Sequence, residues 1–248
     1  MALSAALLLR LEGMALPRGP IGDVRSPRHA MEHDSASRVR RSHVSACEAA
    51  PAKLKVLCLH GYSQNAASLR DKSGGFRRAM KKSLFEFAYV DGPFGCTANG
   101  EPIADADADP LRRAWWRGVS YEGWSTTLES LEALWEKEQF EGVFGFSQGA
   151  AMAAILCGHM KHRKPKFAIF VSGFVPRHPE PANRLLLGVD VPSLHVIGQS
   201  DGIVTPDRSR ALADIFADAM IIEHAGGHTI PSGANVRQQV ASFLEGIR

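Results

Sequence analysis

The stretch "GVFGFSQGAAMAAIL", residues 142–156, decides the fold of this chain. An apolar run typical of a buried strand meets an alanine-rich run typical of a helix, and Ser147 stands at the junction between Gly145 and Gly149. Such a corner needs small residues on both sides because the strand and the helix pass close to each other there. It also forces the serine into a strained conformation that exposes its hydroxyl. The pattern predicts that Ser147 is a nucleophile rather than a serine that caps a tight turn. Ser172 in "FVSGF" is a weaker candidate because it has no second glycine and no helix after it.

Short apolar runs alternate with helical patterns from residue 53 onward. The apolar runs are too continuous for a half-exposed antiparallel sheet and predict parallel strands that are buried on both faces. They occupy residues 53–61, 84–93, 142–146, 166–174, 192–198 and 219–227, and helices are predicted at about 125–137, 148–161, 206–217 and 235–247. Thr205 is the predicted N-cap before Pro206. The alternation predicts a mostly parallel sheet flanked by helices, with the ligand beyond the carboxyl ends of the strands.

A catalytic serine needs an adjacent general base, and histidine is the natural one. Of the ten histidines, His228 alone follows a late strand inside a glycine hinge, "HAGGHTIP", which lets its loop bend back over the strand ends. The rival His224 sits at the strand end itself, where the pleat fixes its direction. We therefore predict that His228 is the base.

The base needs a carboxylate that holds the imidazole in one tautomer. Asp201, in "GQSDGIVTP", comes directly after a predicted strand. Asp190 precedes that strand and so belongs to the opposite edge of the sheet, and Asp207 falls in a first helical turn, where a carboxylate merely suits the helix dipole. Asp201 is the predicted acid. The resulting chain order, Ser, Asp, His, is that of the α/β-hydrolase fold.

Acyl transfer also needs two backbone N–H groups that face the developing oxyanion. One is predicted at Gln148, directly after the nucleophile and at a helix N-terminus. The other is predicted at Tyr62 in the loop "LHGYSQN" after the first strand. His60 in the same loop is interpreted as a structural histidine that shapes it.

An insertion rich in loop formers and aromatic residues spans residues 91–123. It precedes the strand that leads to Ser147, so it is placed to fold over the site. Trp115 and Trp116 are predicted to form an apolar wall for an acyl group. The alternative is that these two side chains only pack within the protein. The run "DADADP", residues 105–110, spaces Asp105, Asp107 and Asp109 as a calcium loop does, but Pro110 and Trp116 stand where such a loop needs glycine and glutamate. We expect a solvated acidic loop, and neither a metal nor a cofactor.

Composition excludes several classes of protein. A net charge of +3, from 29 basic and 26 acidic residues, argues against a nucleic-acid surface. No apolar run approaches the roughly 18 residues that a membrane span needs. The four cysteines are widely scattered and form no CxxC pair, which favours a reducing compartment and hence the cytoplasm.

Residues 1–51 differ from the rest of the chain in their residue pattern, because their apolar residues show no sustained period. We interpret them as a disordered extension ahead of a hydrolase domain at 52–248. A transit peptide to a mitochondrion or plastid is the alternative, although Glu12, Asp23, Glu32 and Asp34 are unusual for one.

The motifs "LCLHGYSQN", "RAWW", "GFSQGAAMAA", "GQSDGIVTP" and "GGHTIP" occur in this order from residue 53 to about 246. In this combination the chain resembles the serine hydrolase FSH family, α/β-hydrolases related to the ovarian-cancer-associated hydrolase. The resemblance implies a carboxylesterase for small-molecule acyl esters, with Ser147, Asp201 and His228 at the positions of the family's triad. An acyl thioesterase and a non-catalytic ligand binder are the alternatives. The sequence predicts neither the acyl chain length nor the oligomeric state.

Overall fold

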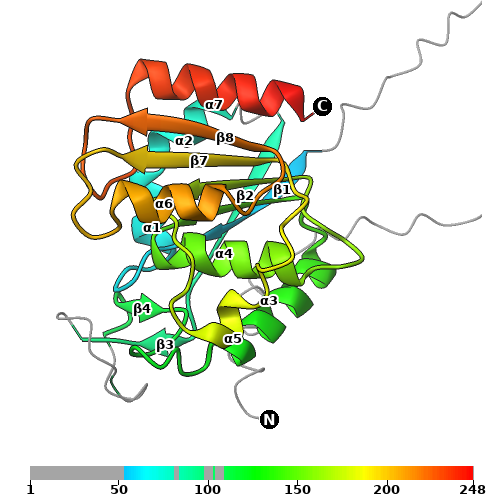
Figure 1. The fold of residues 1–248 in the computed structure, drawn as a ribbon, viewed down its shortest axis with the longest axis vertical. Helices are drawn as coiled ribbons and strands as arrows, with labels where there is room; N and C mark the ends of the chain where they lie inside the picture. Colours follow the sequence, from blue (N-terminus) through cyan, green and yellow to red (C-terminus); the bar gives the residue numbers. More distant parts are fainter. Residues whose placement is uncertain (1–52, 81–83, 98–102, 104–108, 248) are drawn as a thin grey trace, which may run out of the picture. The chain divides into compact units, whose positions relative to one another are not determined.

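Six parallel strands form one sheet in the computed structural model, which describes residues 53–80, 84–97, 103 and 109–247. The strand order is β2-β1-β5-β6-β7-β8 (Figure 1), and every neighbouring pair is parallel. The strands are β1 Leu54–Leu59, β2 Phe85–Val90, β5 Gly142–Phe146, β6 Phe167–Val171, β7 Ser193–Gly198 and β8 Ala219–His224. All six predicted strands are confirmed. Two short antiparallel strands, β3 Phe94–Gly95 and β4 Arg113–Ala114, form a second sheet that was not predicted.

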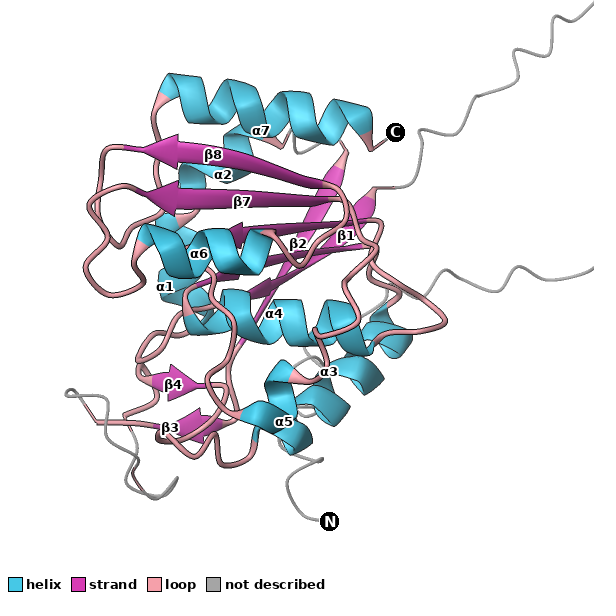
Figure 2. Ribbon diagram, in the orientation of Figure 1, coloured by secondary structure: helices cyan, strands magenta, loops and turns pink. Residues whose placement is uncertain are grey.

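Helices cover both faces of the six-stranded sheet, as Figure 2 shows. They are α1 Ala66–Lys72, α2 Gly74–Ala79, α3 Trp124–Glu138, α4 Gln148–His159, α5 Pro179–Ala182, α6 Pro206–Ala213 and α7 Ala234–Gly246. Buried side chains of α1, α2 and α7 pack into one apolar cluster with the strands, and α3, α4 and α6 lie on the other face. The four predicted helices are α3, α4, α6 and α7. In the described part of the chain, none of the helices has the length and apolar character that a membrane crossing requires.

The end of α6 differs from the prediction. The helix stops at Ala213, four residues early, because the chain after it pairs with Val189. The Val189 N–H donates to the carbonyl of Ile215, and its carbonyl accepts from Ala217, so these residues are taken out of the helix. Thr205 is the N-cap residue before Pro206 as predicted, but its side chain makes no capping hydrogen bond.

Burial differs between the middle and the edges of the sheet. β5, β6 and β7 are buried along their whole length, as predicted. The edge strands β2 and β8 are not, so the prediction of burial on both faces is wrong for them. On β8, Ile222 faces the core at 1% exposure while Ile221 is 42% exposed. The pattern follows from their place in the sheet, because an edge strand loses the cover that a neighbour and its crossover helix give.

Parallel strands bring their carboxyl ends to one edge of a sheet, so the loops after β1, β5, β6, β7 and β8 meet there. All the predicted catalytic residues lie on these loops. The predicted extension, residues 1–51, lies outside the described residues, as do Asp105 and Asp107 of the acidic run.

Candidate active site

Ser147 occupies a strained corner between β5 and α4. Its φ of 54° and ψ of −118° are rarely adopted by a residue other than glycine, and its N–H donates to the carbonyl of Val171 at 2.9 Å. A Cβ on Gly145 would lie 2.5 Å from the Cα of Ala150, and one on Gly149 would lie 2.3 Å from the carbonyl oxygen of Leu59. The predicted need for small residues on both sides of the serine is confirmed.

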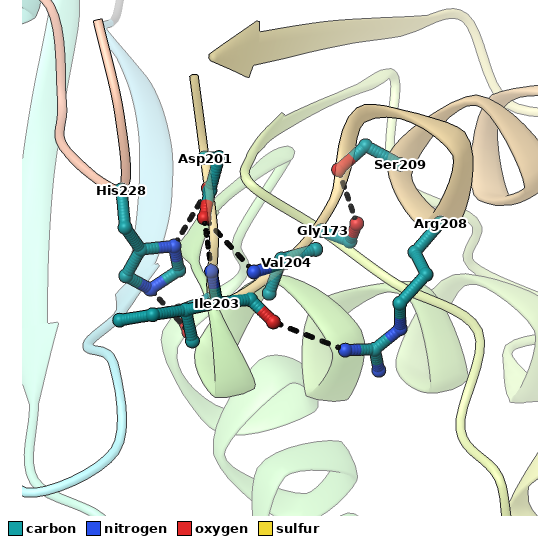
Figure 3. A network of polar contacts seen from close by, with 8 residues as sticks. Gly173, Asp201, Ile203, Val204, Arg208, Ser209 and His228 are labelled. Carbon is teal, nitrogen blue, oxygen red and sulfur yellow. Dashed lines mark hydrogen bonds and ion pairs between the residues drawn. The ribbon is translucent and has the colours of Figure 1, made fainter. Parts of the chain in front are cut away.

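The structure brings Ser147, His228 and Asp201 together from three loops. Figure 3 shows His228 beside Asp201. The hydroxyl of Ser147 lies 2.9 Å from Nε2 of His228, and Nδ1 of His228 lies 2.7 Å from Oδ2 of Asp201. An ionised Asp201 makes Nδ1 the protonated ring nitrogen, which leaves Nε2 to accept the proton of the serine. His224, the rival base, accepts a hydrogen bond from the Gly226 N–H at 3.2 Å instead.

Asp201 is buried and held by the chain that follows it. Its Oδ1 accepts the N–H groups of Ile203 and Val204, both at 2.9 Å. Burial by itself would raise the pKa of this carboxyl, but the hydrogen bonds from His228, Val204 and Ile203, together with the nearby Ser172 hydroxyl, lower the pKa below its ordinary value. Asp201 is therefore ionised at neutral pH although it is only 4% exposed.

The two rival carboxylates lie elsewhere. Asp190 pairs with Lys164 at 3.6 Å and is almost fully exposed. Asp207 pairs with Arg210 at 3.1 Å on the surface of α6. Neither shares a hydrogen bond with His228, so the choice of Asp201 agrees with the geometry.

Sequence reasoning ruled out Ser172 as a nucleophile and missed its place in the site. It follows β6 as Ser147 follows β5, has a φ of 50°, and is 1% exposed. Its hydroxyl makes no direct hydrogen bond to a described residue, yet it lies close enough to Asp201 to lower the pKa of that carboxyl. Strand order could have revealed this, because β6 lies between β5 and β7.

The loop after β1 carries His60 and Tyr62. His60 is fully buried, its Nδ1 donates to the carbonyl of Gly61 at 2.7 Å, and its Nε2 accepts the N–H of Gly92 at 2.8 Å. Burial lowers the pKa of His60 to about 4, so the ring is neutral. The prediction that His60 is structural is confirmed. Tyr62 packs against the small β3–β4 sheet.

Gln148 begins α4, and its backbone N–H belongs to the first turn, whose N–H groups have no acceptor within the helix. Its side chain binds the inserted loop, since Oε1 accepts the Trp115 N–H at 2.9 Å and Nε2 donates to the Trp116 carbonyl at 3.2 Å. The insertion is thereby fastened beside the nucleophile. Sequence reasoning did not foresee this role for the Gln148 side chain.

Trp115 does not present a face to a ligand, contrary to the prediction. It is 1% exposed, its indole N–H donates to the His60 carbonyl at 2.7 Å, and its ring lies against that of His60. Trp116 is 4% exposed and stacks on Tyr121 at 4.7 Å between ring centroids, with Phe174 at its edge. Contact between Trp116 and a substrate stays a prediction.

Metal binding finds no support in the described part of the chain, where no cluster of three or more His, Cys, Asp or Glu side chains could hold an ion. Asp109, the described member of the acidic run, accepts the N–H of Leu111 and pairs with Arg112.

Comparison with known proteins finds serine hydrolases and proteins named esterases over most of the chain. The model of a family described as serine hydrolase (FSH1) matches residues 49–240. "Esterase AGAP003155" of Anopheles gambiae is 36% identical over 212 residues, which cover 77% of this chain and 77% of that protein. "Esterase OVCA2" of Danio rerio is 33% identical over 221 residues, which cover 77% of this chain and 96% of that protein.

Solved structures agree as well. Esterase PE8 is 25% identical with a TM-score of 0.59, over 79% of this chain and 94% of that one. The acyl-protein thioesterase 2 of Zea mays is 20% identical with a TM-score of 0.56, over the same shares of the two chains. The likeness in fold to these enzymes establishes the α/β-hydrolase fold.

Proposed function

Because this chain belongs to the FSH1 family of serine hydrolases, we propose that it is a carboxylesterase that cleaves acyl esters through Ser147, His228 and Asp201. The observation that carries the proposal is the continuous chain of contacts at 2.9 and 2.7 Å from hydroxyl to imidazole to carboxylate. Serine is a weak nucleophile unless a base removes its proton as it attacks, and this geometry supplies the base.

In the first step the Ser147 oxygen attacks the ester carbonyl while Nε2 of His228 takes its proton. Asp201 stabilises the imidazolium that forms and keeps the ring in place. The buried, ionised state of Asp201 suits this role because it places a negative charge 2.7 Å from Nδ1.

The tetrahedral intermediate carries an oxyanion, for which we propose the backbone N–H groups of Gln148 and Tyr62 as donors. The positive end of the α4 dipole favours negative charge at the same point. The hydrogen bonds that fix the Gln148 side chain to the inserted loop hold this helix end in place.

Collapse of the intermediate releases the alcohol, which takes the proton from His228. A water molecule then attacks the acyl-enzyme by the same route in reverse, and Ser147 is regenerated. Apart from the ester and this water molecule, the steps described use side chains and backbone groups of this chain.

A reducing compartment, the cytoplasm, is proposed for the protein. Cys58, Cys96 and Cys157 are unpaired and buried. Burial raises the pKa of the Cys58 and Cys157 thiols, which makes them inert packing groups.

The test combines labelling and turnover. A fluorophosphonate probe should label the wild-type protein and the variant Ser130→Ala, whose exposed serine on α3 makes a local hydrogen bond, but not Ser147→Ala. Turnover of p-nitrophenyl esters should exceed that of acyl-CoA thioesters of the same chain lengths. A wild-type protein that stays unlabelled would favour a ligand binder, and faster cleavage of the thioesters would make it a thioesterase.

A further inference from the structure

Two arginines, Arg177 in the loop after β6 and Arg208 in α6 after β7, lie at the same edge of the sheet as the proposed triad. Arg208 is in the first turn of α6, and its Nη1 donates to the carbonyl of Ile203 at 3.4 Å. The N–H of Ile203 in turn donates to Asp201. Figure 3 shows the Arg208 side chain beside this loop, with Ile203 between it and His228. The guanidinium is thus two hydrogen bonds away from the acid of the triad.

An aromatic ring holds Arg208 in this position. Its guanidinium carbon lies 4.6 Å from the centroid of Phe174, which comes two residues after Ser172. Phe174 is itself placed by an edge contact with Trp116. Stacking on a ring face orients a guanidinium and removes part of its water, so its donors are presented in a defined direction.

Among the described residues no Asp or Glu lies within ion-pair distance of Arg208 or of the exposed Arg177. Arg210, two residues along the same helix, differs because it pairs with both Asp207 and Glu223. Burial and the charge of Arg177 lower the pKa of Arg208, and this outweighs the opposite influence of Tyr121 and Asp201. The negative charge of Asp201 is already engaged by His228 and by the N–H groups of Ile203 and Val204, so neither guanidinium has a described carboxylate of its own.

We propose that Arg208, assisted by Arg177, binds an anionic oxygen group, a carboxylate or a phosphate, on the ester substrate. The inference rests on the proposed esterase function and narrows it to esters that carry negative charge. A planar guanidinium offers paired donors that match either group. Ile203 is 68% accessible, and its N–H donates to the same carboxylate that His228 contacts, so its side chain can provide an apolar contact for the part of the substrate that joins the anion to the ester.

Matched ester pairs test this selectivity. On the acyl side, 4-nitrophenyl hydrogen glutarate is compared with its neutral methyl ester. On the alcohol side, the butyrate ester of 4-hydroxybenzoate is compared with that of methyl 4-hydroxybenzoate. The quantity measured is the ratio of kcat/KM for the anionic to the neutral member, taken relative to wild type so that intrinsic reactivity cancels.

Arg208→Gln should lower this ratio about tenfold to a hundredfold for at least one of the two pairs, as expected for the loss of a charge-assisted contact. Arg177→Gln should lower it less, because that side chain is more exposed, and Arg208→Lys should restore part of it. Arg210→Gln is the matched control and should leave the ratio unchanged. A merely structural role of Arg208 would reduce both members of a pair equally and would overturn the inference.

A binding measurement separates this inference from the esterase proposal. Glutarate or inorganic phosphate should raise the Tm of the wild type and of Ser147→Ala, and should raise that of Arg208→Gln less. The relative size of the two effects distinguishes carboxylate from phosphate. If neither anion raises the Tm and no ratio changes while neutral esters are still cleaved, the anion site is wrong and the esterase function stands. If fluorophosphonate fails to label Ser147 while the anions still bind through Arg208, the esterase function is wrong.

Discussion

Ser147 and Ser172 form two corners that are nearly the same in their backbone. They follow neighbouring strands whose last residues, Phe146 and Val171, are paired in register. Their φ angles are 54° and 50°, and each N–H donates to the next strand along the sheet, at 2.9 and 3.0 Å. Both side chains are buried.

The corners differ in what surrounds the hydroxyl. After Ser147 the helix α4 begins at once, and His228 lies 2.9 Å from the oxygen. After Ser172 the chain continues as a loop, and the oxygen lies beside a carboxylate instead of a base. Backbone strain alone does not activate a serine, because Ser172 shares the positive φ of Ser147 and has no base beside it. Activation depends on the imidazole and on the helix N-terminus, which only one corner has.

The largest expected effect on turnover comes from replacing Ser147, the serine that has a base beside it. Ser147→Ala removes the attacking oxygen and should reduce kcat for a p-nitrophenyl ester by a factor on the order of 10⁶, the loss typical of a catalytic serine. The measurement is turnover alongside fluorophosphonate labelling of the folded protein. Labelling that moved to Ser172 in this variant would show that strain is enough for reactivity, and our interpretation of the difference would be wrong.

The carboxylate of Asp201, which follows the next strand of the sheet, gives the next effect. Asp201→Asn removes the charge that selects the tautomer of His228, and kcat should fall by about 10⁴. Asp207→Asn, on the exposed surface of α6, is the matched control and should have little effect. A nearly silent Asp201→Asn beside a damaging Asp207→Asn would reverse our assignment of the acid.

Glycines near the two corners predict a difference in stability. A Cβ on Gly149 would meet the backbone carbonyls of Leu59 and His60 at 2.3 and 2.4 Å, which cannot move aside easily. A Cβ on Gly173 would meet the flexible end of Leu212 at 2.8 Å. Gly149→Ala should lower the free energy of unfolding by roughly 3 kcal/mol and Gly173→Ala by about 1 kcal/mol, in the range of overpacking effects. Urea unfolding measures both, and equal losses would contradict the argument.

Sequence reasoning succeeded wherever the signal is local. The apolar runs predicted all six strands of the main sheet. The glycines on either side of Ser147 predicted its corner from their spacing alone, and the atoms that a Cβ on Gly145 would meet belong to the helix that follows directly. His228 and Asp201 were found from a simple rule, that catalytic groups follow strands at their carboxyl ends.

It failed where the answer depends on which segments become neighbours. The indole N–H of Trp115 donates to the carbonyl of His60, 55 positions away, and no local sequence pattern predicts that hydrogen bond. The short helices α1 and α2 lack a full apolar period, so they were not predicted. Edge strands cannot be told from central ones without the strand order, and the closeness of Ser172 to Asp201 requires the same knowledge.

The smallest expected effect concerns the corner without a base. Ser172→Ala and Ser172→Gly both remove the hydroxyl that lowers the pKa of Asp201, so both should reduce kcat by several-fold, far less than Ser147→Ala. Only the glycine variant relieves the positive φ, so it should be the more stable of the two. Loss of activity that tracked stability would mean that Ser172 acts only through folding.

A pH series isolates the electrostatic part of this effect. A carboxyl whose pKa is lowered by folding contributes stability that is present above its unfolded pKa, about 3.9, and is lost as the pH falls through the folded pKa. Removal of the Ser172 hydroxyl brings the Asp201 pKa closer to the unfolded value. The free energy of unfolding should therefore fall less steeply below pH 4 in both variants than in the wild type. If the stability curves of the wild type and the two variants ran parallel in that range, Ser172 would have no electrostatic influence on Asp201. Only the Ser147 corner would then be coupled to this carboxylate.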